Sequence, residues 1–125
     1  MIKLLFLAAG GAIGTLSRYA VSGLAHRYFG SVFPFGTLLV NLLGSFAVGL
    51  LWGIFEIASL SPASRSFVFI GILGGFTTFS SYSLETLNLL RDGQVKVALM
   101  NVLLNNFLGL ALAFGGFALA RMLRQ

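Results

Sequence analysis

The chain has 125 residues, of which 58% are hydrophobic and 9% charged, with a mean hydropathy of +0.97 and a net charge of +5. Soluble domains carry roughly 25% charged residues, so this composition excludes a soluble globular protein and predicts an all-α integral membrane protein. The chain contains no cysteine and one histidine, which excludes thiol chemistry and argues against a zinc or haem site.

Four apolar segments reach the length of about 20 residues that a helix needs to cross the hydrocarbon core. They are residues 2–24, 37–57, 67–90 and 95–122. The connectors are residues 26–36, 58–66 and 91–94, and such short links predict antiparallel neighbours. We therefore expect residues 1–125 to form a single four-span transmembrane domain with an uncleaved first span.

The first span carries Gly10 and Gly14 four residues apart, and Arg18 is its only deep cation. Small residues at this spacing let helices approach closely in lipid. Two interpretations of Arg18 stay open: its side chain extends to the far interface, or it lines a vestibule and concentrates anions there.

The second span places Asn41, Ser45, Gly49 and Gly53 on one helix face. Helix packing explains the small residues of this stripe. It does not explain Asn41, whose amide must be satisfied by hydrogen bonds.

The third span is weakened as a helix by glycine and hydroxyl residues between positions 71 and 83. Irregular backbone at membrane depth survives only where protein or a watery cavity surrounds it. The pattern predicts a break in the third helix and a site for a small charged species. Phe79 and Tyr82 share a face near Ser80 and Ser83, and their rings either pack or present positive edges to an anion.

The fourth span has a stripe of Asn101 and Asn105, followed by Gly109 and Ala113. Asparagines in a span either join helices by hydrogen bonds or donate N–H groups to a passing anion. The residue types leave both alternatives open.

The cations divide evenly between the two sides of the membrane. One side carries Lys3, Arg65, Arg121 and Arg124, and the other carries Arg18, Arg27, Arg91 and Lys96. Lys and Arg bias normally sets orientation, so this balance predicts insertion both ways and makes an antiparallel homodimer possible. The even spread along the chain argues against nucleic acid and fits cations that flank spans.

The acidic residues lie away from the middle of the first, second and fourth spans. Glu56 and Asp92 lie at span ends, and Glu85 lies late in the third. Proton-coupled transporters keep a titratable acid at depth, so we expect passive conduction.

The third-span residues 74–83, Gly-Gly-Phe-Thr-Thr-Phe-Ser-Ser-Tyr-Ser, followed by Glu85, closely resemble a motif of the CrcB/Fluc fluoride channels. Residues 36–42 resemble the second-span motif of that family, and residues 10–18 its first. The resemblance implies a dual-topology antiparallel homodimer in the bacterial inner membrane. It also implies two pores through which fluoride leaves the cell down its gradient.

The resemblance also implies roles for individual residues. A central structural sodium ion, not transported, would be held by the carbonyl oxygens of Gly74 and Thr77. The pore would be lined by Asn41, Phe79, Ser80, Tyr82 and Ser83, with Arg18 in a vestibule and Asn101 and Asn105 as possible donors. Tyr82 departs from the family, which usually has phenylalanine there.

Two other classes of membrane protein have this size and number of spans. A dual-topology small multidrug transporter needs a carboxylate in the first span, and residues 2–24 contain none. A non-conducting, holin-like protein would not need the glycine and hydroxyl residues of the third span. The spans contain no group of residues that could act together as base, nucleophile and metal site, so the sequence argues against an enzyme.

Overall fold

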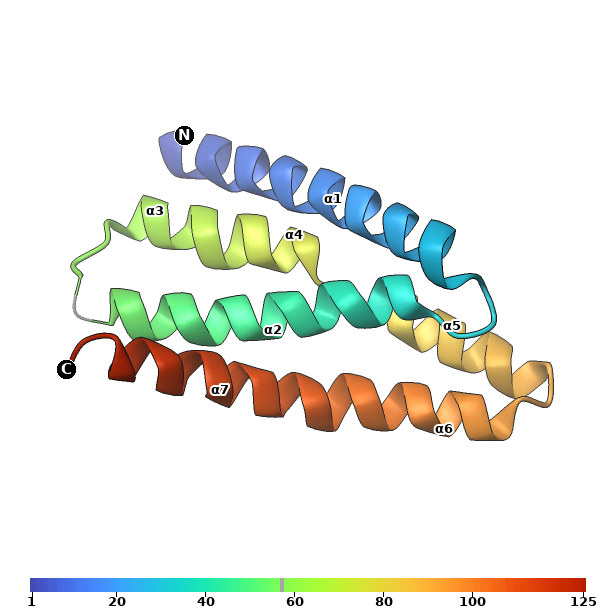
Figure 1. Ribbon diagram of the computed structural model, residues 1–125. Helices are drawn as coiled ribbons and strands as arrows, with labels where there is room; N and C mark the ends of the chain where they lie inside the picture. Colours follow the sequence, from blue (N-terminus) through green and yellow to red (C-terminus); the bar gives the residue numbers. More distant parts are fainter. Residues whose placement is uncertain (57) are drawn as a thin grey trace.

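The computed structural model describes residues 1–56 and 58–125 as a layer of long helices (Figure 1). In chain order the helices are α1 (Ile2–Phe29), α2 (Phe35–Phe55), α3 (Pro62–Arg65), the π-helix η1 (Ser66–Leu73), α4 (Gly74–Phe76), α5 (Phe79–Arg91), α6 (Val95–Leu103), the π-helix η2 (Leu104–Leu108) and α7 (Gly109–Met122). Within the described part of the chain, four stretches are long and apolar enough to cross a membrane: Ile2–Phe29, Phe35–Phe55, Pro62–Arg91 and Val95–Met122.

The predicted bounds agree for the fourth span and differ elsewhere. The first helix continues beyond residue 24 to Phe29, since a helix need not end where its apolar residues end. It stops at Gly30, whose φ of 76° is readily adopted by glycine. The second helix begins at Phe35, two residues early, and its expected end at residue 57 lies outside the described residues. The third begins at Pro62, where Ser61 Oγ accepts a hydrogen bond from the Ser64 amide at 3.1 Å.

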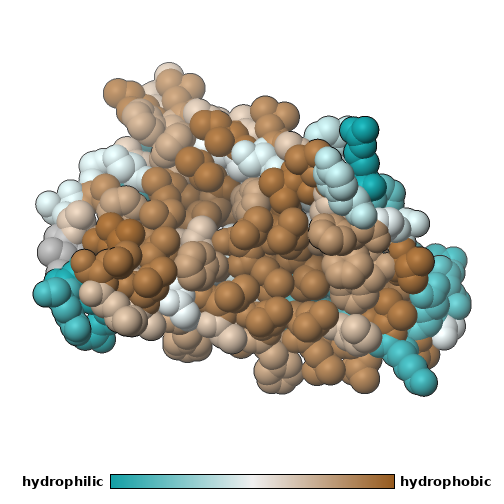
Figure 2. All heavy atoms as spheres, in the orientation of Figure 1, coloured by the Kyte–Doolittle hydropathy of each residue, from teal (hydrophilic) through white to brown (hydrophobic). Residues whose placement is uncertain are grey.

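The chain ends and the connectors divide between two ends of the bundle (Figure 1). Both termini and the link from α2 to α3 lie at one end, and the turns after α1 and α5 lie at the other. A broad hydrophobic surface separates hydrophilic residues at the two ends (Figure 2). This arrangement confirms the predicted up-and-down order of four spans in a multi-pass membrane protein.

The helices contact one another mainly through glycine, and few large side chains are buried between them. Val40 and Asn101 are the largest fully buried side chains among the described residues. Along the α2–α7 contact, a Cβ atom on Gly49 would collide with the Ala113 carbonyl, and one on Gly116 with the Phe46 carbonyl. The glycines therefore set the spacing of the helices.

We predict that Gly116→Ala lowers the free energy of unfolding by about 1–3 kcal/mol, since the added methyl group forces α2 and α7 apart. The matched control is Gly115→Ala, because a Cβ on Gly115 has no atom within 4 Å. Alanine is favoured over glycine in a helix by about 1 kcal/mol, so this control should be as stable as the parent or more so. Thermal unfolding in detergent micelles measures both, and equal destabilisation would contradict the packing argument.

Candidate functional site

The third span leaves helical geometry at residues 77–78, which we call the 77–78 segment. Thr77 has φ −80° and ψ 156°, and Thr78 has φ −149° and ψ 112°, so both are extended. The Thr78 amide donates to Asn41 Oδ1 at 2.8 Å instead of to the carbonyl of Gly74. The Ser81 amide donates to Thr78 Oγ1 at 3.1 Å and begins α5. The carbonyl oxygens of Gly74 and Thr77 consequently lack the amide donors that a continuous helix would supply.

Asn41 binds the main chain of the 77–78 segment on both sides of one residue. Its Oδ1 accepts from the Thr78 amide, and its Nδ2 donates to the Thr78 carbonyl at 3.1 Å. The Nδ2 group also donates to Asn105 Oδ1 at 2.9 Å. The costly amide noted in the sequence is thus fully satisfied, and it ties the second, third and fourth spans together.

The two asparagines of the fourth span form a chain of hydrogen bonds that continues to α5. Asn105 Nδ2 donates to Asn101 Oδ1 and to the Asn101 carbonyl, each at 2.9 Å. Asn101 is completely buried and donates to Thr86 Oγ1 at 3.0 Å. Of the two alternatives left open by the sequence, these contacts favour the joining of helices in the single chain.

A cavity of about 350 Å³ lies against the 77–78 segment. It is lined by Asn41, Gly44, Ser45, Val48, Phe69, Leu73, Gly74, Thr77, Thr78, Phe79, Tyr82, Asn105 and Asn106. The structure therefore brings together most of the predicted site residues from three different spans. Four others lie outside the cavity lining: Arg18, Ser80, Ser83 and Asn101.

Two aromatic rings form one wall of this cavity. The ring centroids of Phe79 and Tyr82 lie 5.2 Å apart with an interplanar angle of 60°. Phe79 is 75% exposed, whereas Tyr82 is 9% exposed. The Tyr82 hydroxyl oxygen accepts a hydrogen bond from Asn106 Nδ2 at 3.0 Å. Asn106 lines the cavity but was not among the predicted site residues.

The two predicted serines make local contacts. Ser83 Oγ donates to the Phe79 carbonyl at 2.9 Å, which is a bond within α5. Ser80 Oγ lies 3.4 Å from Thr78 Oγ1. Both side chains are exposed on the surface of the single chain.

Arg18 reaches from α1 towards the 77–78 segment. Its Nη1 donates to the Thr77 carbonyl at 3.5 Å, and the residue is half-buried. This contact places the guanidinium beside the third span and argues against simple extension to the membrane interface. Arg18 thus adds positive charge next to a carbonyl that lacks its helical donor.

Glu85 lies in a separate cavity close to the connector between α1 and α2. Thr37 Oγ1 donates to Glu85 Oε1 at 2.5 Å, and both residues line that second cavity. The buried Glu85 Oε2 has no hydrogen-bond partner among the described residues. Glu85 is not among the residues that line the cavity at the 77–78 segment.

Comparison with known proteins shows which family this chain belongs to. Residues 5–117 match the family described as CrcB-like protein, Camphor Resistance (CrcB). A fluoride-specific ion channel FluC of Parabacteroides distasonis is 48% identical, over 97% of this chain and 94% of its own length. Proteins of the same name are 46% identical in Shewanella amazonensis, over 93% of this chain and 94% of the relative, and 43% identical in Desulforapulum autotrophicum, over 97% and 98%. The matched region contains the 77–78 segment and every residue that lines its cavity, and the chain belongs to the CrcB-like family.

Proposed function

We propose that this protein is a fluoride-selective channel that lets fluoride leave a bacterial cell through the inner membrane, down its electrochemical gradient. The observation that carries the proposal is the cavity at the 77–78 segment. It combines a small volume, amide and hydroxyl groups and two aromatic rings at the depth of the third span. The FluC relatives, which cover nearly the whole chain, support the same function.

Selectivity for fluoride follows from the size and the lining of such a route. Fluoride is the smallest halide and holds its water most tightly, so it needs hydrogen-bond donors in place of that water. In a narrow route, lining groups with free hydrogens would meet this need, and larger anions would be excluded by size. The positive edges of Phe79 and Tyr82 add weak attraction that lets the ion move on.

We propose that two copies of the chain form an antiparallel, dual-topology homodimer with two pores. In a single chain the route is open on one side, since Phe79 is 75% exposed beside the cavity. A second copy would cover this face. With Arg18 set aside because it contacts Thr77, the two ends of the bundle carry four and three cations, and so small a bias supports insertion in both orientations.

We also propose that a structural sodium ion, which is not transported, is held where the third spans of the two copies cross. The carbonyl oxygens of Gly74 and Thr77 fit this role because the 77–78 segment deprives them of helical donors. Hard cations prefer oxygen ligands, and a two-fold axis would supply the same pair from each copy. The ion would join the broken third spans of the two chains.

The function is tested by efflux from liposomes that contain the purified protein. We predict rapid fluoride efflux and little chloride efflux under the same gradient, because the route replaces the water of a small anion only. Protein-free liposomes provide the background rate. Equal rates for the two anions would refute the selectivity, and no efflux of either would favour a non-conducting membrane protein.

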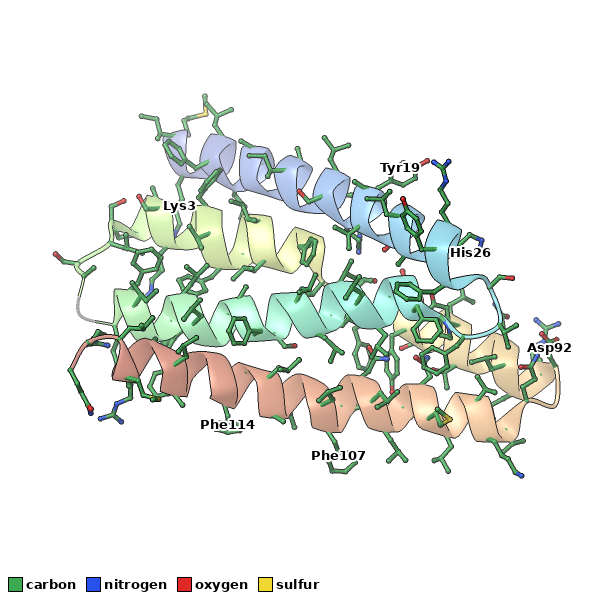
Figure 3. The ribbon with its side chains drawn as sticks, in the orientation of Figure 1. Lys3, Tyr19, His26, Asp92, Phe107 and Phe114 are labelled. Carbon is green, nitrogen blue, oxygen red and sulfur yellow. The ribbon has the colours of Figure 1, made fainter. Side chains whose placement is uncertain are left out.

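We predict that Phe79→Ile slows fluoride efflux by about tenfold while the dimer stays intact, since the aliphatic side chain keeps bulk but removes the ring edge. Phe107→Ile is the matched control, because Phe107 is 70% exposed and points away from the bundle (Figure 3). Size-exclusion chromatography checks assembly. An unchanged rate in Phe79→Ile would show that this ring only packs.

The sodium site is tested by replacing sodium exhaustively with a much larger organic cation. We predict that subunits of differently labelled dimers then exchange faster and that fluoride efflux falls, because the carbonyl oxygens lose their shared ion. Adding sodium back should reverse both effects. Full efflux and unaltered subunit exchange in sodium-free solution would exclude the ion.

A further inference from the structure

The Tyr82 hydroxyl is held in a fixed orientation by Asn106. Asn106 Nδ2 donates one hydrogen to the Tyr82 hydroxyl oxygen at 3.0 Å and the other to the Val102 carbonyl at 2.8 Å. Both hydrogens of this amide group are therefore used. The Val102 bond fixes the amide on its own helix, and the amide in turn fixes the phenol.

The π-helix η2 explains why Asn106 reaches the cavity. Residues Leu104–Leu108 follow an i→i+5 pattern, which is wider than an α-helical turn. In a regular α-helix Asn106 would lie beside the stripe of Asn101 and Asn105. The wider turn brings Asn105 and Asn106 onto the same cavity wall.

The direction of this hydrogen bond determines where the phenol proton can go. An Asn NH₂ group only donates, so the Tyr82 oxygen is the acceptor and its own proton is directed elsewhere. None of the described residues accepts that proton, and the ring borders the cavity. Acceptance of one hydrogen bond also polarises the O–H group and makes it a better donor.

The other polar groups of the cavity are mostly committed to protein acceptors. Both Nδ2 hydrogens of Asn41 and of Asn105 are used within the chain. The Thr77 hydroxyl donates to the Leu73 carbonyl at 3.0 Å, and the Thr78 hydroxyl to Ser81 Oγ at 3.0 Å. Ser45 and Tyr82 also line the cavity, and neither hydroxyl has an acceptor among the described residues. Of these two, only the Tyr82 oxygen is oriented by a hydrogen bond that it accepts.

We propose that the Tyr82 hydroxyl donates a hydrogen bond directly to fluoride in the cavity, and that Asn106 is the positioning residue that aims it. The inference rests on the proposed function and adds a polar contact to the ring edge. Fluoride is the strongest hydrogen-bond acceptor among the halides, so the contact favours fluoride over chloride.

The first test is Tyr82→Phe, which removes the hydroxyl and keeps the ring. One hydrogen bond corresponds to about a three- to tenfold change, so we expect the half-saturating fluoride concentration for efflux to rise by this factor. Tyr19→Phe is the matched control, because Tyr19 is exposed on α1 (Figure 3) and does not line this cavity. An unchanged half-saturating concentration in Tyr82→Phe would overturn the inference.

The second test asks whether Asn106 acts by orienting the Tyr82 hydroxyl or only by stabilising the fold. Asn106→Leu should raise the half-saturating concentration to a similar degree in the parent chain and have no further effect in Tyr82→Phe, since Asn106 acts through the hydroxyl. Equal effects in both backgrounds would overturn the role of Asn106.

The third test observes binding without conduction and does not depend on a variant that must conduct. Fluorine NMR of the dimer labelled with 3-fluorotyrosine gives a signal for Tyr82, identified by its loss in Tyr82→Phe. We expect this signal to shift on titration with sodium fluoride and not with sodium chloride. No shift, in a protein that passes fluoride and excludes chloride, would overturn the inference and leave the proposed function standing. Equal passage of both anions would remove the proposed function itself.

Discussion

The structure depends on one requirement: peptide groups that leave helical geometry at membrane depth must find partners within the protein. Asn41 meets this requirement for the 77–78 segment by binding the amide and the carbonyl of Thr78. The hydroxyl of Thr78 then caps α5 through the Ser81 amide. These hydrogen bonds hold the 77–78 segment in one conformation, and they gather polar groups at one level of the third span.

The same requirement explains the small residues nearby. Asn41 can reach Thr78 only if α2 lies close to the third span, and Gly44 permits this approach, since a Cβ there would meet the Thr77 side chain. The α2–α7 glycines allow a similar approach on the other side and bring Asn105 within 2.9 Å of Asn41. The close packing at the glycines thus brings the helices near enough for the asparagine amides to form their hydrogen bonds.

Much of the fold could be predicted because hydropathy marks where a chain meets lipid. The four spans, their alternation and the fourth span's bounds follow from it. It does not report where helical hydrogen bonding stops, so α1 extends to Phe29 through His26 and Arg27. Composition predicted a weakened helix over residues 71–83, because glycine and hydroxyl residues weaken a helix, and the extended residues 77–78 lie within that range.

The site could be predicted in part for a related reason. Residue type singled out the amide of Asn41, and the family resemblance implied pore roles for Phe79 and Tyr82. All three residues line the cavity. Residue type could not give the direction of a hydroxyl, and Ser83 binds its own helix. Asn106 was missed because a regular helical period puts it off the stripe, and no sequence signal marks the π-helical turn that moves it.

Conduction requires that an anion be attracted and yet released. The number of free hydrogen-bond donors at the cavity therefore matters. If the amides of Asn41, Asn105 and Asn106 all pointed free hydrogens into the cavity, they would hold fluoride strongly, as a binding protein does. Their hydrogens are instead committed to protein oxygens. What faces the cavity is a wall with weak ring edges and few free hydroxyl protons. A lining whose stronger donors maintain its shape leaves few free hydrogens for a small anion, so the anion is held weakly enough to be released.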